Sequence, residues 1–288
     1  IEINFENRVE WGIKMYVSVA VMDTGIFRHM DFDTRIAGFA DFVGRKKYLY
    51  DDNGHGTHVA GIIAGSGKGS NGKYRGIAPD TFLVSVKVLD KSGNGKIENV
   101  VEAAGWIIEN KSAMNIRVVN ISFGTRAKME NGPAIETGED DYALIMAVEK
   151  MWDSGIVVVA AAGNNGPGNA SVTAPGISKK IITVGAFDDK NFFSGRGPTR
   201  ECIVKPEVVV TGSNIIACNN RQGRYSSKSG TSMAAPVVSG AVARLIKNNP
   251  DITPKEVKIW MKSCCKKINV PSEKQGWGVL DIRKFVTG

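Results

Sequence analysis

The chain has 288 residues, of which 37 are Lys or Arg and 29 are Asp or Glu, so its formal net charge is +8. Its hydrophobic fraction of 42% and charged fraction of 23% are those of an ordinary globular protein, which excludes intrinsic disorder, collagen and coiled coil. No run approaches the ~18–20 consecutive apolar residues of a membrane helix, so we expect no membrane partner, whereas the basic balance at first suggests nucleic acid.

Apolar runs typical of buried parallel strands recur along the chain, at residues 16–22, 82–89, 116–121, 156–162, 181–184 and 207–210. Helical patterns alternate with them and follow them, at residues 55–64, 97–110, 141–153 and 232–247. Thr253, as an N-cap before Pro254, predicts one more short helix. This alternation predicts a three-layer α/β/α sandwich with a mainly parallel sheet. No linker or internal repeat divides the chain, so we expect one domain over residues 1–288.

Glycine is over-represented, with 33 residues against 10 prolines. The glycines cluster between the apolar runs, at residues 65–76, 93–95, 163–168 and 223–230. Glycine is favoured where the backbone turns tightly or comes close to a ligand. We therefore expect a site built from loops at the carboxyl ends of the strands, where ligands bind in open parallel sheets.

The four cysteines show neither a disulfide framework nor the spacing of a metal site. They are Cys202, Cys218, Cys264 and Cys265. Free thiols are typical of a reducing compartment such as the cytoplasm. The chain begins at Ile1 without a signal peptide, and we expect that an upstream segment was removed, so secretion is an equal alternative.

The three histidines are His29, His55 and His58, and the last two lie in Asn-Gly-His55-Gly-Thr-His58 before a helical run. A histidine at a helix start between glycines is uncrowded and open to a cleft. The i, i+3 spacing of His55 and His58 could also indicate a metal pair. No Glu lies between them and no third histidine is near, so we do not expect zinc at this pair.

Asp23 and Ser232 indicate catalysis only when they are considered together with His55. Asp23 ends the apolar strand Val-Ala-Val-Met-Asp23, where a lone Asp commonly caps the next turn. Ser232 follows Gly-Thr at the start of a helix, where a lone Ser is commonly an N-cap. Together with His55 they form a candidate Ser-His-Asp set for nucleophilic catalysis.

These segments resemble those of the subtilisin-like serine proteases, or subtilases. The matching strings are Val-Ala-Val-Met-Asp23-Thr-Gly, Asn-Gly-His55-Gly-Thr-His-Val-Ala-Gly, Gly-Thr-Ser232-Met-Ala-Ala-Pro and Ala-Ala-Ala-Gly-Asn164-Asn-Gly. The order Asp, His, Ser is the one that general descriptions of this family give. The resemblance extends over about residues 15–285 and points to a bacterial branch that often lacks secretion signals.

The resemblance implies a serine endopeptidase that passes through an acyl-enzyme. Ser232 would attack the scissile carbonyl, His55 would carry the proton, and Asp23 would orient the imidazole. The Asn164 side chain and the Ser232 backbone N–H would form the oxyanion hole, where one such donor contributes about 3–4 kcal/mol to lowering the barrier. No cofactor is required for this chemistry.

The resemblance also implies an extended peptide substrate that adds to the protein as a β-strand. Ala161, Ala162 and Gly163 would form small walls of an S1 pocket with room for a sizeable side chain. Ile97 and Val100 would lie near an apolar S4 pocket, although their helical spacing equally fits a core face. The remaining residues assigned to substrate binding are Ser122, Phe123, Gly124, Gly93 and Gly95.

Three acidic features could affect substrate preference, metal binding or the rim of the cleft. Asp51 and Asp52 could favour a basic P2 residue or be solvated loop charges. Asp31 stands where the family often places a calcium ligand, but residues 65–76 carry three cations and no carboxylate, which disfavours calcium. Residues 126–141 form an acidic insertion of net charge −3, either at the rim of the cleft or as a surface loop.

Two other function classes compete with the peptidase. A catalytically silent subtilase-fold binding protein would be expected to lack a triad or oxyanion residue. A nucleic-acid binder would be expected to show a recognised binding motif, and none occurs. Residues 242–288 hold ten bases and four acids, a net +6, which indicates a solvated face away from the cleft. We therefore expect polypeptide substrates, a removed N-terminal propeptide as partner, no nucleic acid, and a monomer.

Overall fold

The computed structural model describes residues 16–125, 138–199 and 201–288. Their main sheet has nine strands in the order β10-β11-β7-β6-β5-β4-β1-β3-β2. Every pair is parallel except β10 with β11. The strands are β1 (Ser18–Asp23), β2 (Ile36–Asp41), β3 (Phe82–Lys87), β4 (Ile116–Ile121), β5 (Val157–Ala161), β6 (Ile182–Ala186), β7 (Val208–Val210), β10 (Cys265–Lys266) and β11 (Val279–Leu280).

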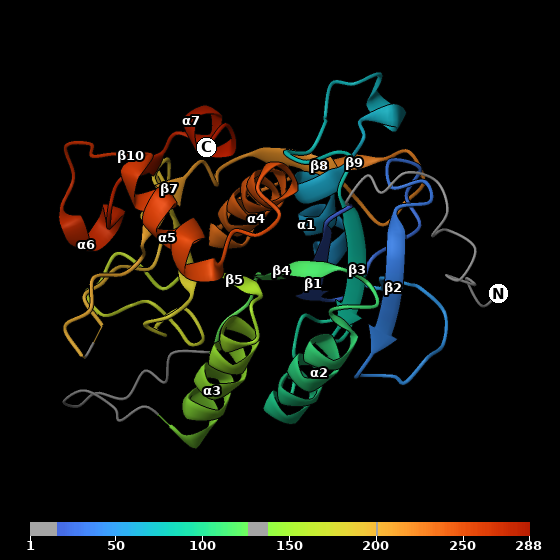
Figure 1. Cartoon of the computed structure of the whole chain (residues 1–288), viewed down its shortest axis with the longest axis horizontal. Coiled ribbons are helices and arrows are strands. Elements are labelled where there is room, and N and C mark those ends of the chain that lie inside the picture. Colours follow the sequence, from blue (N-terminus) through green and yellow to red (C-terminus); the bar gives the residue numbers. More distant parts are fainter. Residues whose placement is uncertain (1–15, 126–137, 200) are drawn as a thin grey trace.

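Helices cover both faces of this sheet (Figure 1). On one face lie α1 (His55–Ala64) and α4 (Thr231–Asn248), and on the other α2 (Ile97–Asn110) and α3 (Glu139–Asp153). The shorter elements are η2 (Lys68–Ser70), the antiparallel hairpin β8 (Ile215–Cys218) with β9 (Tyr225–Lys228), α5 (Pro254–Ser263), α6 (Ser272–Gln275) and α7 (Ile282–Val286).

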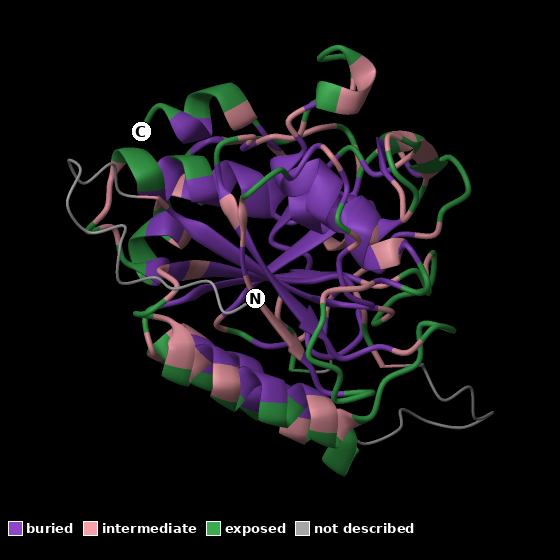
Figure 2. Cartoon of the chain, turned by 90° about the vertical axis from the view of Figure 1, so that its right-hand side faces the viewer, coloured by how far each residue is buried: buried purple, intermediate pink, exposed green. Residues whose placement is uncertain are grey.

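The side chains of β1 explain why the sheet needs cover on both faces. Val19 and Val21 point into a core cluster shared with α1 and α4, whereas Ala20 and Met22 point into a second cluster shared with α2 and α3. All six residues of β1 are buried, as expected for a central parallel strand. Figure 2 shows the sheet buried between the helices, with exposed residues on the outer side of the helix layers.

The predicted sandwich is confirmed, and the bounds of α1, α2 and β4 are those read from the sequence. Thr253 caps α5 as expected, since its side chain accepts a hydrogen bond from the N–H of Glu256 in a complete capping box. The edge strand β2 and the hairpin β8–β9 were not predicted. Their strands are only partly buried, so they lack the continuous apolar run that marks the central strands.

Two further findings, on membrane-spanning helices and on cysteines, apply to the described residues. Within them, no helix combines the length and the apolar character needed to cross a bilayer. All four cysteines are free thiols, including the adjacent pair Cys264 and Cys265.

Candidate active site

The order of the strands changes direction at β1, which lies between β3 and β4. In an open parallel sheet, a ligand binds outside the carboxyl ends of the strands at such a switch point. Here three polar residues mark those ends. Asp23 ends β1, Lys87 ends β3, and Ser122 follows β4.

Asp23 and His55 form the central hydrogen-bonded pair of this edge. The His55 ring Nδ1 lies 2.8 Å from Asp23 Oδ1 and 3.0 Å from Oδ2. Asp23 is fully buried, whereas the His55 side chain is 25% exposed. Burial lowers the pKa of His55, but the charge of Asp23 and its hydrogen bond outweigh this effect and raise the pKa above 6.5.

Gly56 allows the start of α1 to approach the end of β1. A Cβ atom at Gly56 would lie 2.1 Å from the carbonyl oxygen of Gly25 and 3.1 Å from Asp23 Cβ. In its absence, the Gly56 N–H donates to Thr24 Oγ1 at 2.9 Å. The glycine after His55 therefore serves a close contact within the protein rather than one with substrate.

Asp51 is a buried cap for the loop that carries His55. Its Oδ1 accepts hydrogen bonds from the N–H groups of Asn53 and Gly54, and its Oδ2 accepts from the N–H and hydroxyl of Thr57. The hydroxyl of Thr24 donates to the same carboxylate. Asp51 is only 6% exposed, so it is neither a solvated loop charge nor directed at substrate.

Lys87, which the sequence did not single out, supports the same edge. Its side chain is 1% exposed, and its Nζ donates to the carbonyl oxygens of Thr24 and Leu89 and to Asp52 Oδ1. The charge of Asp52 is therefore partnered within the protein. A buried ammonium with three acceptors joins the ends of β1 and β3 to the His55 loop.

His58 has a structural role that differs from that of His55. Its Nε2 lies 3.1 Å from the Ile215 carbonyl oxygen and 2.9 Å from that of Ser226, so the ring links α1 to both strands of the β8–β9 hairpin. Burial lowers its pKa to about 4, which keeps the ring neutral. The two carbonyl acceptors fix the tautomer in which Nε2 carries the proton.

Ser232 lies in the first turn of α4, after Gly230 with φ of +147°. Its hydroxyl donates to the Ser122 carbonyl oxygen at 2.8 Å, and the Ser122 hydroxyl donates back to the Ser232 carbonyl oxygen at 3.0 Å. Among the described residues this is the hydrogen bond that Ser232 Oγ makes, and no bond to His55 accompanies it. The structure thus joins Asp23 with His55 but leaves the hydroxyl turned to β4.

Asn164, beyond the end of β5, is held by the residue before Ser232. Its Oδ1 accepts from the backbone N–H of Thr231 at 3.0 Å and from the Thr231 hydroxyl at 3.1 Å. That hydroxyl in turn accepts from the N–H of Gly163. Because a backbone N–H can pair only with the oxygen of the amide, these bonds fix which amide atom is Oδ1 and which is Nδ2. Nδ2 lies next to Gly230, where an added Cβ would be 3.3 Å from it.

Thr173 lies between Gly163, a predicted wall of the S1 pocket, and Gly124, a residue predicted to pair with the substrate backbone. A Cβ at Gly124 would lie 2.1 Å from Thr173 Oγ1, and one at Gly163 would lie 2.7 Å from it. Thr173 is 8% exposed, and its hydroxyl has no hydrogen-bond partner among the described residues. This side chain reduces the room expected beside Ala161 and Ala162, which are themselves buried.

The glycines assigned to substrate binding fall into two groups. Gly93 has φ of +78° and no atom within 4 Å of its missing Cβ, so it is open to a ligand. Gly95 instead packs on its own segment, because a Cβ there would lie 2.7 Å from Leu89 and 2.8 Å from the carbonyl oxygen of Val88. Gly124 likewise adjoins Thr173, so two of these glycines are explained by contacts inside the protein.

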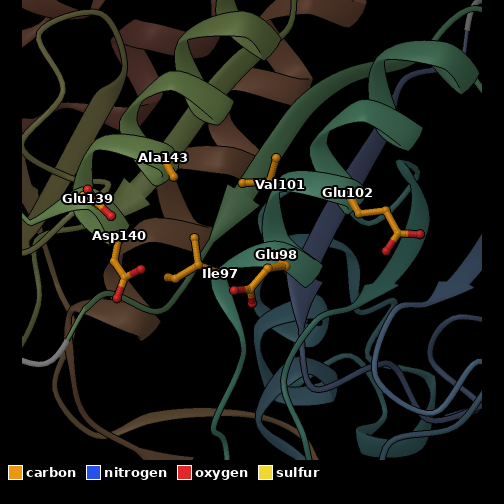
Figure 3. A pocket seen from close by; sticks show the side chains of 7 residues that line it. All are labelled: Ile97, Glu98, Val101, Glu102, Glu139, Asp140 and Ala143. Carbon is orange, nitrogen blue, oxygen red and sulfur yellow. The ribbon is translucent and has the colours of Figure 1, made fainter.

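The two residues predicted near the S4 pocket lie in different surroundings. Val100 is 3% exposed and belongs to the core cluster under α2 and α3. Ile97, by contrast, lines an open groove of about 460 Å³ between the starts of α2 and α3 (Figure 3). The groove has an apolar floor and an acidic rim, and the other residues along it are Glu98, Val101, Glu102, Glu139, Asp140 and Ala143.

Most of the acidic insertion predicted at residues 126–141 falls outside the described residues. Its last part is described, and Glu139 begins α3. Glu139, Asp140 and Asp141 stand in the first turn of that helix, where negative charge interacts favourably with the helix dipole.

Asp31, the predicted calcium ligand, is surrounded by hydrogen-bond donors. Its carboxylate accepts from the N–H groups of Gly67 and Gly69 at 3.0 and 2.8 Å and from the Tyr225 hydroxyl at 2.9 Å. The Cys218 thiol lies 3.5 Å from its Oδ2. Calcium requires six to eight oxygen ligands, whereas this surrounding offers N–H, O–H and S–H groups. The residues present therefore do not fit calcium at Asp31.

Comparisons with known proteins find related sequences and structures. The family model described as the subtilase family matches residues 15–278. Serine protease AprX of Bacillus subtilis (strain 168) is 43% identical over 274 residues, which cover 86% of this chain and 60% of that protein. Subtilisin DY of Bacillus licheniformis is 35% identical over 84% of this chain and 81% of that protein.

A solved structure described as a cold adapted subtilisin-like serine proteinase is 31% identical, with a TM-score of 0.72. The match covers 92% of this chain and 86% of that one. The chain thus spans only about 60% of the length of AprX but most of the length of this solved enzyme.

Proposed function

Since the chain belongs to the subtilase family of serine-type endopeptidases, we propose that it hydrolyses peptide bonds through Asp23, His55 and Ser232. The observation that carries this proposal is the pair of hydrogen bonds, 2.8 and 3.0 Å long, from one imidazole nitrogen to both oxygens of a buried aspartate. This contact fixes the Nδ1–H tautomer and leaves Nε2 as a base. The serine on α4 supplies the nucleophile.

In the proposed reaction, Ser232 Oγ first turns from the Ser122 carbonyl to His55 Nε2. It attacks the scissile carbonyl carbon while its proton passes to that nitrogen. Collapse of the tetrahedral intermediate forms the acyl-enzyme, and the leaving amine takes the proton from His55. Water then attacks the ester while His55 takes its proton, and His55 passes that proton to Ser232 Oγ as the acid product leaves. Asp23 stabilises the imidazolium, which is the effect that raises the pKa of His55.

Asn164 and the Ser232 backbone N–H are proposed to bind the oxyanion. Support comes from the anchoring of the amide, since Thr231 holds Oδ1 and leaves the N–H groups of Nδ2 as the donors. A donor fixed in advance stabilises developing charge without reorganising. No cofactor enters these steps.

Substrate is proposed to bind as an extended strand along Ser122–Gly124 and the segment around Gly93. Its P1 side chain would meet Thr173, whose unpaired hydroxyl favours a small or polar group over a large aromatic one. Ile97, beside the groove between α2 and α3, is proposed to contact an apolar residue further upstream. Residues 1–288 would act as one catalytic domain and as a monomer, after removal of a propeptide.

Labelling with a serine-directed fluorophosphonate, followed by peptide mapping, tests the proposal. We expect one label at Ser232, loss of the label and of casein hydrolysis in Ser232→Ala, and retention of both in Ser227→Ala, an exposed serine of β9. A folded wild-type chain that neither takes the label nor cleaves casein would instead be a silent, binding member of the family.

A further inference from the structure

Three chemically different ligand groups meet in a buried cluster that takes no part in the proposed catalysis. His29, Asp31 and Cys218 each offer one atom, and these atoms all lie within 4.8 Å of one another. The three residues are 2%, 0% and 0% exposed. His29 and Asp31 lie between β1 and β2, and Cys218 ends β8.

The three groups are close enough to converge on one ion. Asp31 Oδ1 lies 3.7 Å from His29 Nδ1, and the other carboxylate oxygen, Oδ2, lies 3.5 Å from Cys218 Sγ. Zinc bond lengths and a tetrahedral angle place nitrogen and oxygen ligands about 3.4 Å apart, and sulfur and oxygen ligands about 3.6 Å apart. Because the two observed separations involve different oxygens, the carboxylate has to rotate so that it can serve both neighbours around one ion.

The surroundings orient these groups as they are oriented in known metal sites. His29 Nε2 lies 3.1 Å from the carbonyl oxygen of Arg224, which fixes the Nε2–H tautomer. The lone pair of Nδ1 accepts a hydrogen bond from the backbone N–H of Asp31 at 3.2 Å, a bond that the ion would replace. A ligating histidine normally donates its second N–H to such an acceptor. The N–H groups of Gly67 and Gly69 hold the carboxylate from outside.

We infer that His29 Nδ1, the Asp31 carboxylate and Cys218 Sγ form a structural site for one thiophilic divalent cation of the zinc class. The ion takes the place of the thiol proton, which leaves to solvent, so the Sγ–H bond is replaced by an Sγ–metal bond. Its two positive charges balance the carboxylate and the thiolate, and the guanidinium of Arg35, which donates to the Asp31 carbonyl oxygen, adds a positive charge nearby. The Tyr225 hydroxyl donates to Asp31 Oδ2 at 2.9 Å and to Oδ1 at 3.0 Å.

The same donor set explains why zinc fits where calcium does not. Zinc accepts nitrogen and sulfur and needs only four ligands, whereas calcium needs more oxygens than this cluster holds. Cys218 also packs on α1, because a Cβ at Gly61 would lie 3.1 Å from its Sγ. An ion bound here would tie α1, the helix that begins with His55, to the segment after β1 and to β8.

Cobalt titration tests the site, since a thiolate bound to Co²⁺ absorbs in the near ultraviolet. The full chain with Ser232→Ala, which cannot digest itself, is treated with chelator, dialysed and titrated with Co²⁺. We expect one equivalent to give the charge-transfer band and tetrahedral visible bands, and Zn²⁺ but not Ca²⁺ to abolish them. Absence of the charge-transfer band at excess Co²⁺ would overturn the assignment.

Matched variants separate this cluster from other thiols. Cys218→Ala should lose the band, whereas Cys202→Ala, which removes an exposed thiol, should keep it. If Cys218→Ala is unfolded by circular dichroism, His29→Gln decides, with Co²⁺ affinity expected to fall by on the order of tenfold or more. A band that persists in folded Cys218→Ala, or an unchanged affinity in His29→Gln, refutes the site. Neither result depends on catalysis.

Discussion

Replacing Gly56 by alanine tests how closely the base must approach the strand that carries Asp23. The new Cβ would lie 2.1 Å from the Gly25 carbonyl oxygen, and ordinary contact begins at about 3.4 Å. Because the obstacle is backbone, the start of α1 has to move by about 1 Å. His55 directly precedes Gly56, so its bonds to Asp23 would lengthen. A misplacement of this size costs about 10²-fold in rate, or about 2.7 kcal/mol of barrier.

The assay is kcat/KM on a chromogenic peptide amide, with the melting temperature measured in Ser232→Ala chains that do and do not carry the change. Gly105→Ala is the matched control, since Gly105 is exposed within α2 and has no atom within 4 Å of its missing Cβ. This control should gain up to about 1 kcal/mol of stability and keep wild-type kcat/KM. A Gly56→Ala enzyme within twofold of wild type would refute the reasoning.

Three other predictions follow from groups described here. The neutral form of His55 is the base, and Asp23 raises its pKa, so kcat/KM should rise with pH through a midpoint above 6.5; a midpoint at or below 6.5 contradicts this. Thr173→Gly should raise the kcat/KM ratio of Phe over Ala at P1 by on the order of tenfold, and an unchanged ratio would show that Thr173 does not limit the pocket. Glu207 is buried and bonded to Lys205 Nζ at 2.7 Å and Lys258 Nζ at 2.9 Å, and burial lowers the pKa of Lys205 to about 8. Glu207→Gln removes the carboxylate that pairs with the buried ammonium of Lys205. We expect it to lower the free energy of unfolding of the Ser232→Ala chain in urea by about 3–5 kcal/mol, and a loss under about 1 kcal/mol would contradict this prediction.

The central strands were predictable because they are buried on both faces. β4 is apolar at most positions and bounded by polar residues, so its length could be read directly. β2 contains Gly38 and three other partly buried residues at the sheet edge, and the glycine interrupts its short apolar segment, so it lacks the continuous β-branched run of the central strands. Burial, rather than intrinsic strand preference, is what the sequence pattern reports.

The site was predictable where its residues form local motifs and unpredictable where it depends on distant contacts. Asp23, His55 and Asn164 each stand in a short string with its own signal. Thr173 and Lys87 have none, because each acts on segments far away in the chain that only the fold brings near. Asp51 was misread for the same reason, since its partners are backbone N–H groups that a sequence does not display.

The candidate site is assembled from distant parts of the chain, since Asp23 ends β1 and Ser232 lies in α4. Asp23 and His55 are translated early, whereas Asn164 and Ser232 come much later. At ~5–20 residues per second, Ser232 follows His55 after roughly 10–35 s. Under the proposed mechanism, the nascent polypeptide therefore has no nucleophile during that interval and gains peptidase activity only after α4 has been made.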